Sequence, residues 1–543
     1  MNAVPDLGRQ GRGGTGEMQE GHFPRREDGT PRPFWERRDF VLALVLLSAL
    51  PLLWPDVPPL LDLPGHMGRY RVQLDLATSA PLREYYGFQW AVIGNLGVDL
   101  LVQWLAPLIG LEAAVKLIIV AVPPLTVAGL LWVAYEVHGR VPPSALFAVP
   151  FAYNFPLLFG FVNFALAMGL ALVAFAFWLR LGRLNRVWLR AALFVPISLV
   201  LWLAHAFGWG TLGVLAFSAE LVRQHDRGRS FHLAGFHAGL HCLALVPPVA
   251  LMLAWRSNAA GQTADLFNWV SKYDWLVMAL RDRWEWWDRA SLSFCVLIMA
   301  WSIVDKRMTW SRNLAASFLF LALVYVLLPR IVFGSAYADM RLAPYLFAIG
   351  LVAIRFKDQS ALGFRRTIAV TALAFVLLRT GATTYSTWLY DESYDRELGA
   401  LAHVPHGARM VSFIGRNCSE PWGMSRLLHL SALATVRNHA FSNDQWTMEG
   451  AQLLHVRYRN GFPFIRDPTQ IVTLVRCRGE AWLTIDQALA QFPRDAFDYV
   501  WLITPPPYDA ALTQGLEPVW RSGSSVLYRV ADRSPFAPPP KDP

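Results

Sequence analysis

An acidic side chain and an imidazole stand four residues apart in the segment Asp62-Leu63-Pro64-Gly65-His66. The segment directly follows the first long apolar run of the chain. Ionisable groups beside hydrocarbon are costly, so at a membrane face they are candidates for function. A partly desolvated carboxylate has a raised pKa and can take the proton of a hydroxyl group as that oxygen forms a new bond. Asp62 is therefore the first candidate for a general base. The simpler alternative is a hydrated loop aspartate.

His66 and Arg69 extend this candidate site. His66 could hydrogen-bond the Asp62 carboxylate, contact a phosphate, or join Asp62 as a ligand of a divalent metal. Two such ligands make a weak metal motif, so a metal requirement stays open. Arg69 lies in a segment where basic residues are otherwise scarce. It could bind the phosphate of a lipid-linked substrate or that of an ordinary phospholipid.

A second cluster of charged residues lies late in the chain, between two apolar runs. It contains Arg330, Asp339 and Arg341. A guanidinium group matches phosphate oxygens in two-pronged geometry, so Arg330 or Arg341 could hold a phosphate leaving group. The alternative is a purely structural pair between Asp339 and Arg341.

Polar side chains also border the apolar runs near Gly160. Tyr153, Asn154 and Asn163 carry phenol and amide groups that bind sugar hydroxyls, and they are candidates for substrate contacts. Amides at such places more often cap helix ends. For His205, at the end of another apolar run, packing at a helix end is the favoured interpretation.

The composition is that of a membrane protein. The chain has 543 residues, of which 54% are hydrophobic and 16% charged, whereas soluble domains carry about 25% charged residues. The net charge is +9, but the basic residues form short clusters between apolar runs rather than a patch or stripe. This distribution indicates membrane topology and argues against nucleic-acid binding.

The apolar runs predict an α-helical polytopic membrane protein with about eleven spans, several of them shorter than the roughly 20 residues that a bilayer prefers. The predicted spans are 39–55, 113–136, 142–157, 161–180, 190–205, 208–222, 233–254, 291–304, 313–329, 341–354 and 367–386.

The basic residues predict the orientation of these spans. With a cytoplasmic N-terminus, the inner segments hold more than twice as many Lys and Arg residues as the outer loops. We therefore expect a disordered cytoplasmic tail at 1–38 and a membrane domain at 39–389 with a long outer loop at 55–111. Residues 95–110 are apolar enough for a span, but a span there would reverse the orientation. We expect them to form a helix at the membrane surface.

The remainder of the chain predicts a small extracytoplasmic α/β domain over 390–532, followed by a disordered tail at 533–543. A helical pattern covers 484–492. If the compartment is oxidising, Cys418 and Cys477 could form a disulfide. Three stretches have the composition of strands: 408–413, 499–503 and 525–530.

An Asp-x-Pro-x-His segment after the first span, followed by an amphipathic stretch and about eleven spans, resembles the GT-C superfamily of integral membrane glycosyltransferases. The resemblance implies a bacterial inner-membrane enzyme with Asp62 as its catalytic acid. It implies a polyprenyl-phosphate-linked sugar as donor and an outer-face glycan, lipid or protein as acceptor. A second acidic residue of the family has no clear match, and Asp99, Asp274 and Asp339 are candidates.

Two other functions stay open. A transporter or lipid flippase would carry charges near the middle of its spans and repeated broken helices, whereas the polar candidates here gather at one face. A non-catalytic partner in envelope assembly would use the outer domain for binding.

Overall fold

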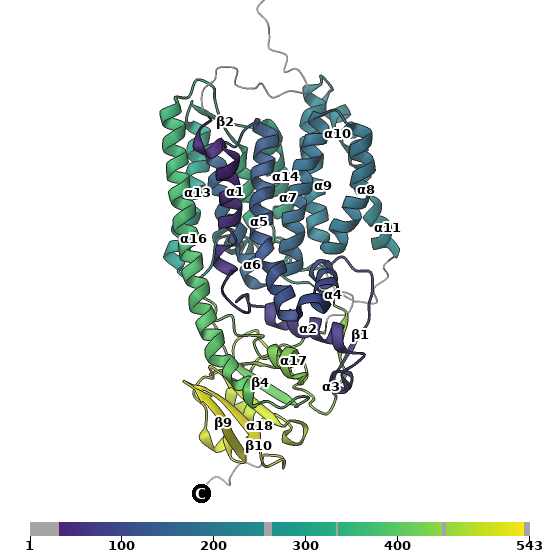
Figure 1. Ribbon diagram of the computed structural model, residues 1–543, viewed down its shortest axis with the longest axis vertical. Coiled ribbons are helices and arrows are strands. Elements are labelled where there is room, and N and C mark those ends of the chain that lie inside the picture. Colours follow the sequence, from purple (N-terminus) through teal and green to yellow (C-terminus); the bar gives the residue numbers. More distant parts are fainter. Residues whose placement is uncertain (1–31, 255–262, 333–334, 448–451, 537–543) are drawn as a thin grey trace, which may run out of the picture.

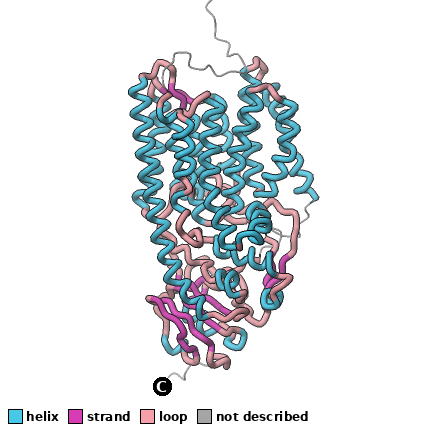
Figure 2. The backbone as a smooth tube through the Cα atoms, viewed as in Figure 1, coloured by secondary structure: helices cyan, strands magenta, loops and turns pink. Residues whose placement is uncertain are grey.

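A computed structural model gives the structure of the protein, which is mostly helical with a sheet near the C-terminal end (Figures 1 and 2). Long helices lie side by side in a bundle, and most of the strands gather beyond one end of it. The structure describes residues 32–254, 263–332, 335–447 and 452–536. Most of the two predicted tails, at 1–38 and 533–543, lies outside these ranges.

Five helices are long and apolar enough to cross a membrane, which is compatible with a multi-pass membrane protein. They are α5 (Leu111–His138), α7 (Val162–Arg183), α8 (Val187–Ala204), α13 (Glu285–Val304) and α16 (Leu362–Leu398). A sixth span results if α10 (Phe231–Cys242) and α11 (Pro247–Ala254), which meet at 64°, are taken together. All of them coincide with predicted spans.

The other predicted spans coincide with elements that are shorter or more polar, so the count of eleven is not confirmed. These are α1 (Arg38–Leu47), a 3-10 helix at Pro143–Tyr153 with α6 (Phe155–Phe159), α9 (Ala206–Asp226), α14 (Arg312–Leu327) and α15 (Ala343–Ala353). The 3-10 helix begins at Pro143 and contains Pro150. Proline removes a backbone donor and clashes with the preceding turn, which explains why no regular α-helix forms there.

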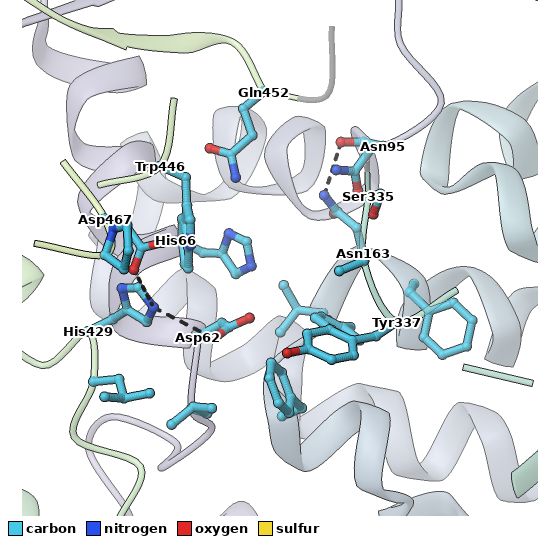
Figure 3. Close-up of a pocket in the computed structure, with 18 of the residues that line it drawn as sticks. Asp62, His66, Asn95, Asn163, Ser335, Tyr337, His429, Trp446, Gln452 and Asp467 are labelled. Carbon is cyan, nitrogen blue, oxygen red and sulfur yellow. Dashed lines mark hydrogen bonds and ion pairs between the residues drawn. The ribbon is translucent and has the colours of Figure 1, made fainter. Parts of the chain in front are cut away.

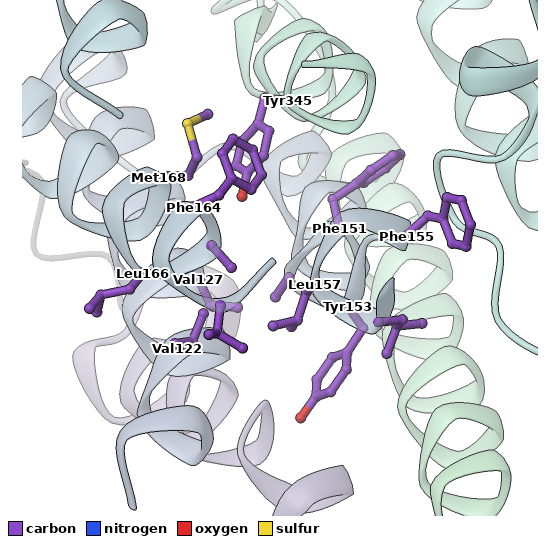
Figure 4. Close-up of a cluster of buried hydrophobic side chains, with 14 of the residues drawn as sticks. Val122, Val127, Phe151, Tyr153, Phe155, Leu157, Phe164, Leu166, Met168 and Tyr345 are labelled. Atoms are coloured by element: carbon purple, nitrogen blue, oxygen red, sulfur yellow. The ribbon is translucent and has the colours of Figure 1, made fainter. Parts of the chain in front are cut away.

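The centre of the bundle is packed tightly around α5 and α7. A Cβ atom added at Gly129 would come within 2.6 Å of Cβ of Leu172, and one added at Gly169 within 3.1 Å of Leu125. Small residues at such crossings let two helix backbones approach closely. Aromatic and aliphatic side chains from α5, α6, α7 and α15 fill the space around this crossing (Figure 4).

The predicted outer loop 55–111 folds into short elements. They are α2 (Leu63–Asp75), α3 (Ala80–Tyr85), β1 (Tyr86–Phe88) and α4 (Gly97–Ile109). The predicted helix at 95–110 is present as α4, which exposes Trp104 and Leu108. Its position at a membrane surface stays a prediction.

The sheet has six strands in the order β7-β6-β4-β8-β10-β9, with β7, β6, β4 and β8 parallel and β8, β10 and β9 antiparallel. The strands are β4 (Met410–Gly415), β6 (Ile471–Thr473), β7 (Leu483–Thr484), β8 (Tyr499–Ile503), β9 (Leu516–Ser522) and β10 (Ser525–Val530). Two of the three predicted strands match β8 and β10, and the third begins two residues late as β4.

Smaller elements complete the fold. The predicted helical pattern at 484–492 is α18 (Ile485–Gln491), which begins with a capping box between Thr484 and Gln487. The others are α12 (Trp269–Val277), α17 (Ala432–Asn438), the pair β2 (Met308–Trp310) with β3 (Ile354–Phe356), and β5 (Leu454–Val456), which pairs with β1. Cys418 and Cys477 are joined in a disulfide.

One helix links the bundle to the sheet. α16 has 37 residues, or about 55 Å at 1.5 Å per residue, and it extends from the far end of the bundle to the sheet (Figure 1). The predicted boundary between the membrane domain, which ends at residue 389, and the extracytoplasmic domain falls inside this unbroken helix. We refer below to the residues after α16 as the C-terminal region.

A buried ion pair, and a hydrogen bond to a second ion pair within the bundle, hold the C-terminal region against the bundle. Arg379 of α16 contacts Asp288 of α13 at 2.7 Å, and both side chains are almost fully buried. Trp422 of the C-terminal region donates a hydrogen bond to the same carboxylate at 2.8 Å. Arg426 contacts Asp282 at 2.5 Å. Because buried charges must be paired, these contacts fix where the C-terminal region docks.

We expect Arg379→Gln to destabilise the protein by about 3–5 kcal/mol, because it leaves the buried Asp288 carboxylate without its cation. Thermal unfolding of the purified protein in detergent would measure this as a lower Tm. Arg366→Gln is the matched control, since Arg366 is exposed on the same helix. Equal Tm values for the two variants would contradict the role of the pair.

Candidate active site

A cavity of about 400 Å³ lies where the bundle meets the C-terminal region (Figure 3). One wall carries Asp62 and His66, from the start of α2. The wall from the C-terminal region carries His429, Trp446 and Asp467. The cavity therefore joins parts of the chain that are more than 350 residues apart. Its aromatic lining consists of Phe159, Phe161, Phe164, Tyr337, Trp446 and Trp482.

Backbone contacts fix Asp62 at the cavity wall. Its N–H donates to the carbonyl oxygen of Phe159 at 3.0 Å. Its own carbonyl accepts the N–H of His66 at 3.1 Å, in the first turn of α2. Gly160 has φ +103°, and a Cβ atom there would lie 2.6 Å from the backbone nitrogen of Asp62. Only glycine allows this close approach at this backbone angle.

The charges around Asp62 leave its carboxylate poorly compensated. The nearest basic side chain within ion-pair distance is His429, whose Nε2 lies 3.9 Å from Oδ1. Burial raises the pKa of Asp62 to about 7. His429 and Arg341 oppose this shift, and the carboxylate of Asp467 adds to it. A carboxylate with a pKa near neutrality is a stronger base than an ordinary aspartate and still loses its proton at physiological pH.

The imidazole of His429 is held in one orientation. Its Nδ1 lies 3.0 Å from the carbonyl oxygen of Asp444. A carbonyl oxygen only accepts hydrogen bonds, so Nδ1 carries the proton and Nε2 faces the carboxylates. The ring packs on Trp446 with centroids 4.2 Å apart. Nε2 is 3.9 Å from Asp62 and 4.0 Å from Asp467, so the imidazole stands between two carboxylates (Figure 3).

His66 lies in the cavity wall beside Asp62, as the sequence predicts. Its ring packs against Trp446 at 5.1 Å. Burial, followed by the charge of Arg69, lowers the pKa of His66 well below its usual value. His66 is therefore a neutral imidazole, which suits hydrogen bonding to a substrate better than binding a phosphate by charge.

Two guanidinium groups line the cavity. Arg341 is buried, packs on Phe161 at 4.4 Å and donates to Oγ of Ser335 at 3.4 Å. Its Nε finds no hydrogen-bond partner among the residues that the structure describes. Arg416 packs over Trp482 at 4.6 Å and contacts Glu420 at 2.9 Å. Together these two residues can attract an anionic group into an otherwise aromatic cavity.

Other predicted site residues lie outside the cavity lining. Arg330 pairs with Asp265 at 3.3 Å. Asp339 pairs with Lys272 at 3.3 Å, so the suggested structural pair between Asp339 and Arg341 is replaced by an ion pair to α12. Both residues hold the loop that positions Arg341.

Arg69 is likewise part of the structure around the cavity. It forms a buried ion pair with Asp99 at 2.9 Å, and Asn163 donates to the same carboxylate at 3.0 Å. Asn163 also lines the cavity. The paired Arg69 is therefore not available to a phosphate in this arrangement.

The remaining candidates near Gly160 have local roles. Tyr153 donates to the carbonyl oxygen of Ser48 at 2.7 Å. Asn154 caps α6, where it accepts the N–H of Leu157 at 3.1 Å. His205 caps α9, as expected for a helix end, and also lines the cavity.

The sequence did not single out His429, Asp467 or Arg416. None of the three stands in a recognisable motif, and all reach the cavity only because the C-terminal region docks on the bundle. The three candidates for a second acid, Asp99, Asp274 and Asp339, are absent from the lining, and Asp467 is there instead. Within the described ranges, no group of three or more His, Cys, Asp or Glu side chains is arranged to hold a metal ion.

No protein-family model matches the chain, and no curated protein matches it. The functional assignment therefore rests on the residues and their geometry.

We expect the stability of the protein to depend on pH through Asp62. Its pKa is about 7 when folded against a usual 3.8, so the folded state holds a proton that the unfolded chain has lost, and stability falls as pH rises from about 4 to 7. Asp62→Asn removes this loss. Relative to wild type, the variant should gain up to about 4 kcal/mol between pH 4 and pH 8.

Unfolding in detergent across this pH range would measure the difference. Asp56→Asn is the matched control, because Asp56 is exposed and lies six residues earlier in the chain. A constant difference between Asp62→Asn and wild type over the whole range would show that Asp62 is not desolvated.

Proposed function

We propose that the protein is an integral membrane glycosyltransferase of the GT-C type. It would transfer a sugar from a polyprenyl-phosphate donor to a hydroxyl group of an acceptor glycan, lipid or protein. The observation that carries the proposal is the desolvated Asp62 carboxylate, which faces a cavity lined by aromatic rings and two arginines at one end of a bundle of long apolar helices.

The distribution of charge supports chemistry at an extracytoplasmic face of an inner membrane. Arg307 and Arg355 belong to the β2–β3 region, which lies at the end of the bundle opposite the sheet (Figure 1). Basic residues favour the cytoplasmic side. The cavity and the C-terminal region would then face outward, with the N-terminus in the cytoplasm and the shorter apolar helices completing the eleven spans.

Each group of the cavity has a chemical role in this proposal. Asp62 takes the proton of the acceptor hydroxyl as that oxygen bonds to the anomeric carbon from the face opposite the leaving group, which inverts the configuration. The bond between carbon and phosphate oxygen breaks, and its electron pair stays on the phosphate. Arg341 stabilises the charge on the departing phosphate, and Arg416 assists with its Nε, which the ion pair with Glu420 leaves without a hydrogen-bond partner in the described part of the chain. Arg416 takes the place that the sequence suggested for Arg330.

The aromatic lining suits both parts of the donor. Phe159, Phe161 and Tyr337 of the bundle offer flat apolar surfaces to the cavity, and Trp446 and Trp482 of the C-terminal region do the same. Sugar rings stack on such faces through their C–H groups, and isoprenoid chains bury apolar area against them.

We expect Asp62→Asn to lower transfer at least about 100-fold, because general-base catalysis contributes about 10²–10⁴-fold. The measurement is the profile of glycans and lipid-linked sugars in cells that carry wild type, a deletion or Asp62→Asn. Deletion and Asp62→Asn should lose the same sugar and accumulate the same lipid-linked donor, while Asp56→Asn matches wild type. A deletion that changes the profile while Asp62→Asn does not would favour a transporter or an assembly partner.

We expect Gly160→Ala to reduce transfer as well, because a Cβ atom at 2.6 Å from the Asp62 nitrogen must displace the carboxylate. A misplacement of about 1 Å can cost about 100-fold in rate. Gly210→Ala is the control, since a Cβ there meets nothing within 4 Å. Both variants should reach the membrane in equal amounts. Wild-type profiles from Gly160→Ala would rule out the proposed position of Asp62.

A further inference from the structure

The C-terminal region contributes an imidazole to the carboxylate that the proposed chemistry needs. Nε2 of His429 lies 3.9 Å from Asp62 and 4.0 Å from Asp467. The His429 side chain is 5% exposed, against 13% for Asp62 and 23% for Asp467. The imidazole thus lies between the two carboxylates, and of the three groups Asp467 is the most exposed to solvent.

The surroundings of His429 fix both its position and its free nitrogen. The Asp444 carbonyl accepts from Nδ1. The Asp444 carboxylate accepts from Oγ of Ser431 at 2.9 Å, and Ser431 in turn accepts from Ser412 on β4 at 2.9 Å. A network of this kind locks a side chain in one orientation. It holds the lone pair of Nε2 toward the two carboxylates.

We propose that His429 is the relay that removes the proton from Asp62 after each transfer, with Asp467 stabilising the imidazolium that forms. The inference rests on the proposed transferase function and goes beyond it, because it gives the C-terminal region a part in turnover. His429 acts through Asp62 and is therefore a positioning and relay residue.

The proton balance of the relay is simple. The acceptor hydroxyl loses its proton to a carboxylate oxygen of Asp62 in the transfer step. The neutral Nε2 of His429 then takes that proton, and Asp62 returns to its carboxylate form. Nε2 passes the proton toward Asp467 and to bulk water. A separation of 3.9 Å is too long for a direct hydrogen bond, so one bridging water or a small closure of the cavity must connect the groups.

All charged neighbours of the pair belong to this arrangement. Around Asp62 the influential groups are His429, Asp467 and Arg341. Around His429 they are the carboxylates of Asp62, Asp467 and Asp444, together with His66, which is held neutral. Burial raises the pKa of Asp444 as well. The relay gives the proton of Asp62 a route out of the cavity before the next turnover.

Loss of the imidazole with partial chemical rescue is the central test. Membranes from cells that carry His429→Ala are assayed for consumption of their own lipid-linked donor, identified as the species that accumulates with Asp62→Asn. We expect turnover to fall about 10- to 100-fold and added imidazole to restore part of it. His406→Gln is the control, because His406 is exposed in the C-terminal region; it should behave as wild type with or without imidazole.

The pH profile separates a relay from a merely structural residue. Removal of the imidazole should move the acid limb of the rate profile of His429→Ala to higher pH, because His429 lowers the pKa of Asp62 and this effect is lost. An unchanged acid limb in the rate profile of His429→Ala, together with no rescue by added imidazole, would overturn the proposal that His429 relays the proton. If Asp62→Asn itself leaves the donor pool unchanged, the transferase function fails instead, so the two failures are distinguishable.

A measurement without substrate keeps the inference falsifiable if His429→Ala does not fold. Histidine-labelled protein in detergent is compared by NMR as wild type and as Asp62→Asn at one pH. Asp62→Asn should change the ring nitrogen chemical shifts of one imidazole, assigned to His429, because the carboxylate that faces it at 3.9 Å is lost, and should leave those of the exposed His406 unchanged. If no imidazole responds, the two groups are not coupled and the relay is excluded.

Discussion

The docking of the C-terminal region onto the helix bundle is the constraint on which the cavity depends. The ion pairs Arg379–Asp288 and Arg426–Asp282 are buried at this junction, where an unpaired charge would cost several kcal/mol. Arg426 also donates to the carbonyl oxygen of Pro59 at 2.8 Å, three residues before Asp62. The contacts that hold the C-terminal region therefore also fix the segment that presents the carboxylate, and neither wall of the cavity is complete without the other.

In this arrangement the C-terminal region supplies side chains to the lining of the cavity. Its loops contribute His429, Asp467 and Arg416. The bundle supplies Arg341 and the aromatic wall around Phe161. Each of the two parts of the chain thus contributes one of the two arginines, and the Asp62 carboxylate meets its imidazole partner only where the two parts join.

The sequence predicts the helices and strands that depend on local composition. It does not predict the cavity residues that meet only when the C-terminal region docks on the bundle. Apolar runs located α5, α7 and α16 because a long apolar helix is a continuous hydrophobic stretch of sequence, and strand-forming composition located β8 and β10. Prolines made 142–157 a largely 3-10 segment, which a hydropathy pattern does not reveal. Asp62 and His66 were found from their place after an apolar run. His429 was not, because it reaches Asp62 across more than 360 residues of chain. Arg330 and Arg341 share one loop, yet only Arg341 lines the cavity.

Asp62 and Asp99 lie in the same loop, and their different surroundings separate structure from chemistry. The Asp99 carboxylate is fully buried, pairs with Arg69 at 2.9 Å and accepts from Asn163 at 3.0 Å. Such a carboxylate is held in a buried ion pair and lies outside the cavity lining. The carboxylate of Asp62 lines the cavity and accepts no hydrogen bond from any side chain in the described part of the protein, and the imidazole of His429 lies 3.9 Å away. A buried acid left this way costs stability, and the fold tolerates the cost because Gly160, the first turn of α2 and Arg426 hold its backbone in place. A buried carboxylate with few compensating partners, held in place by several separate contacts of the backbone, fits the general base of the proposed reaction.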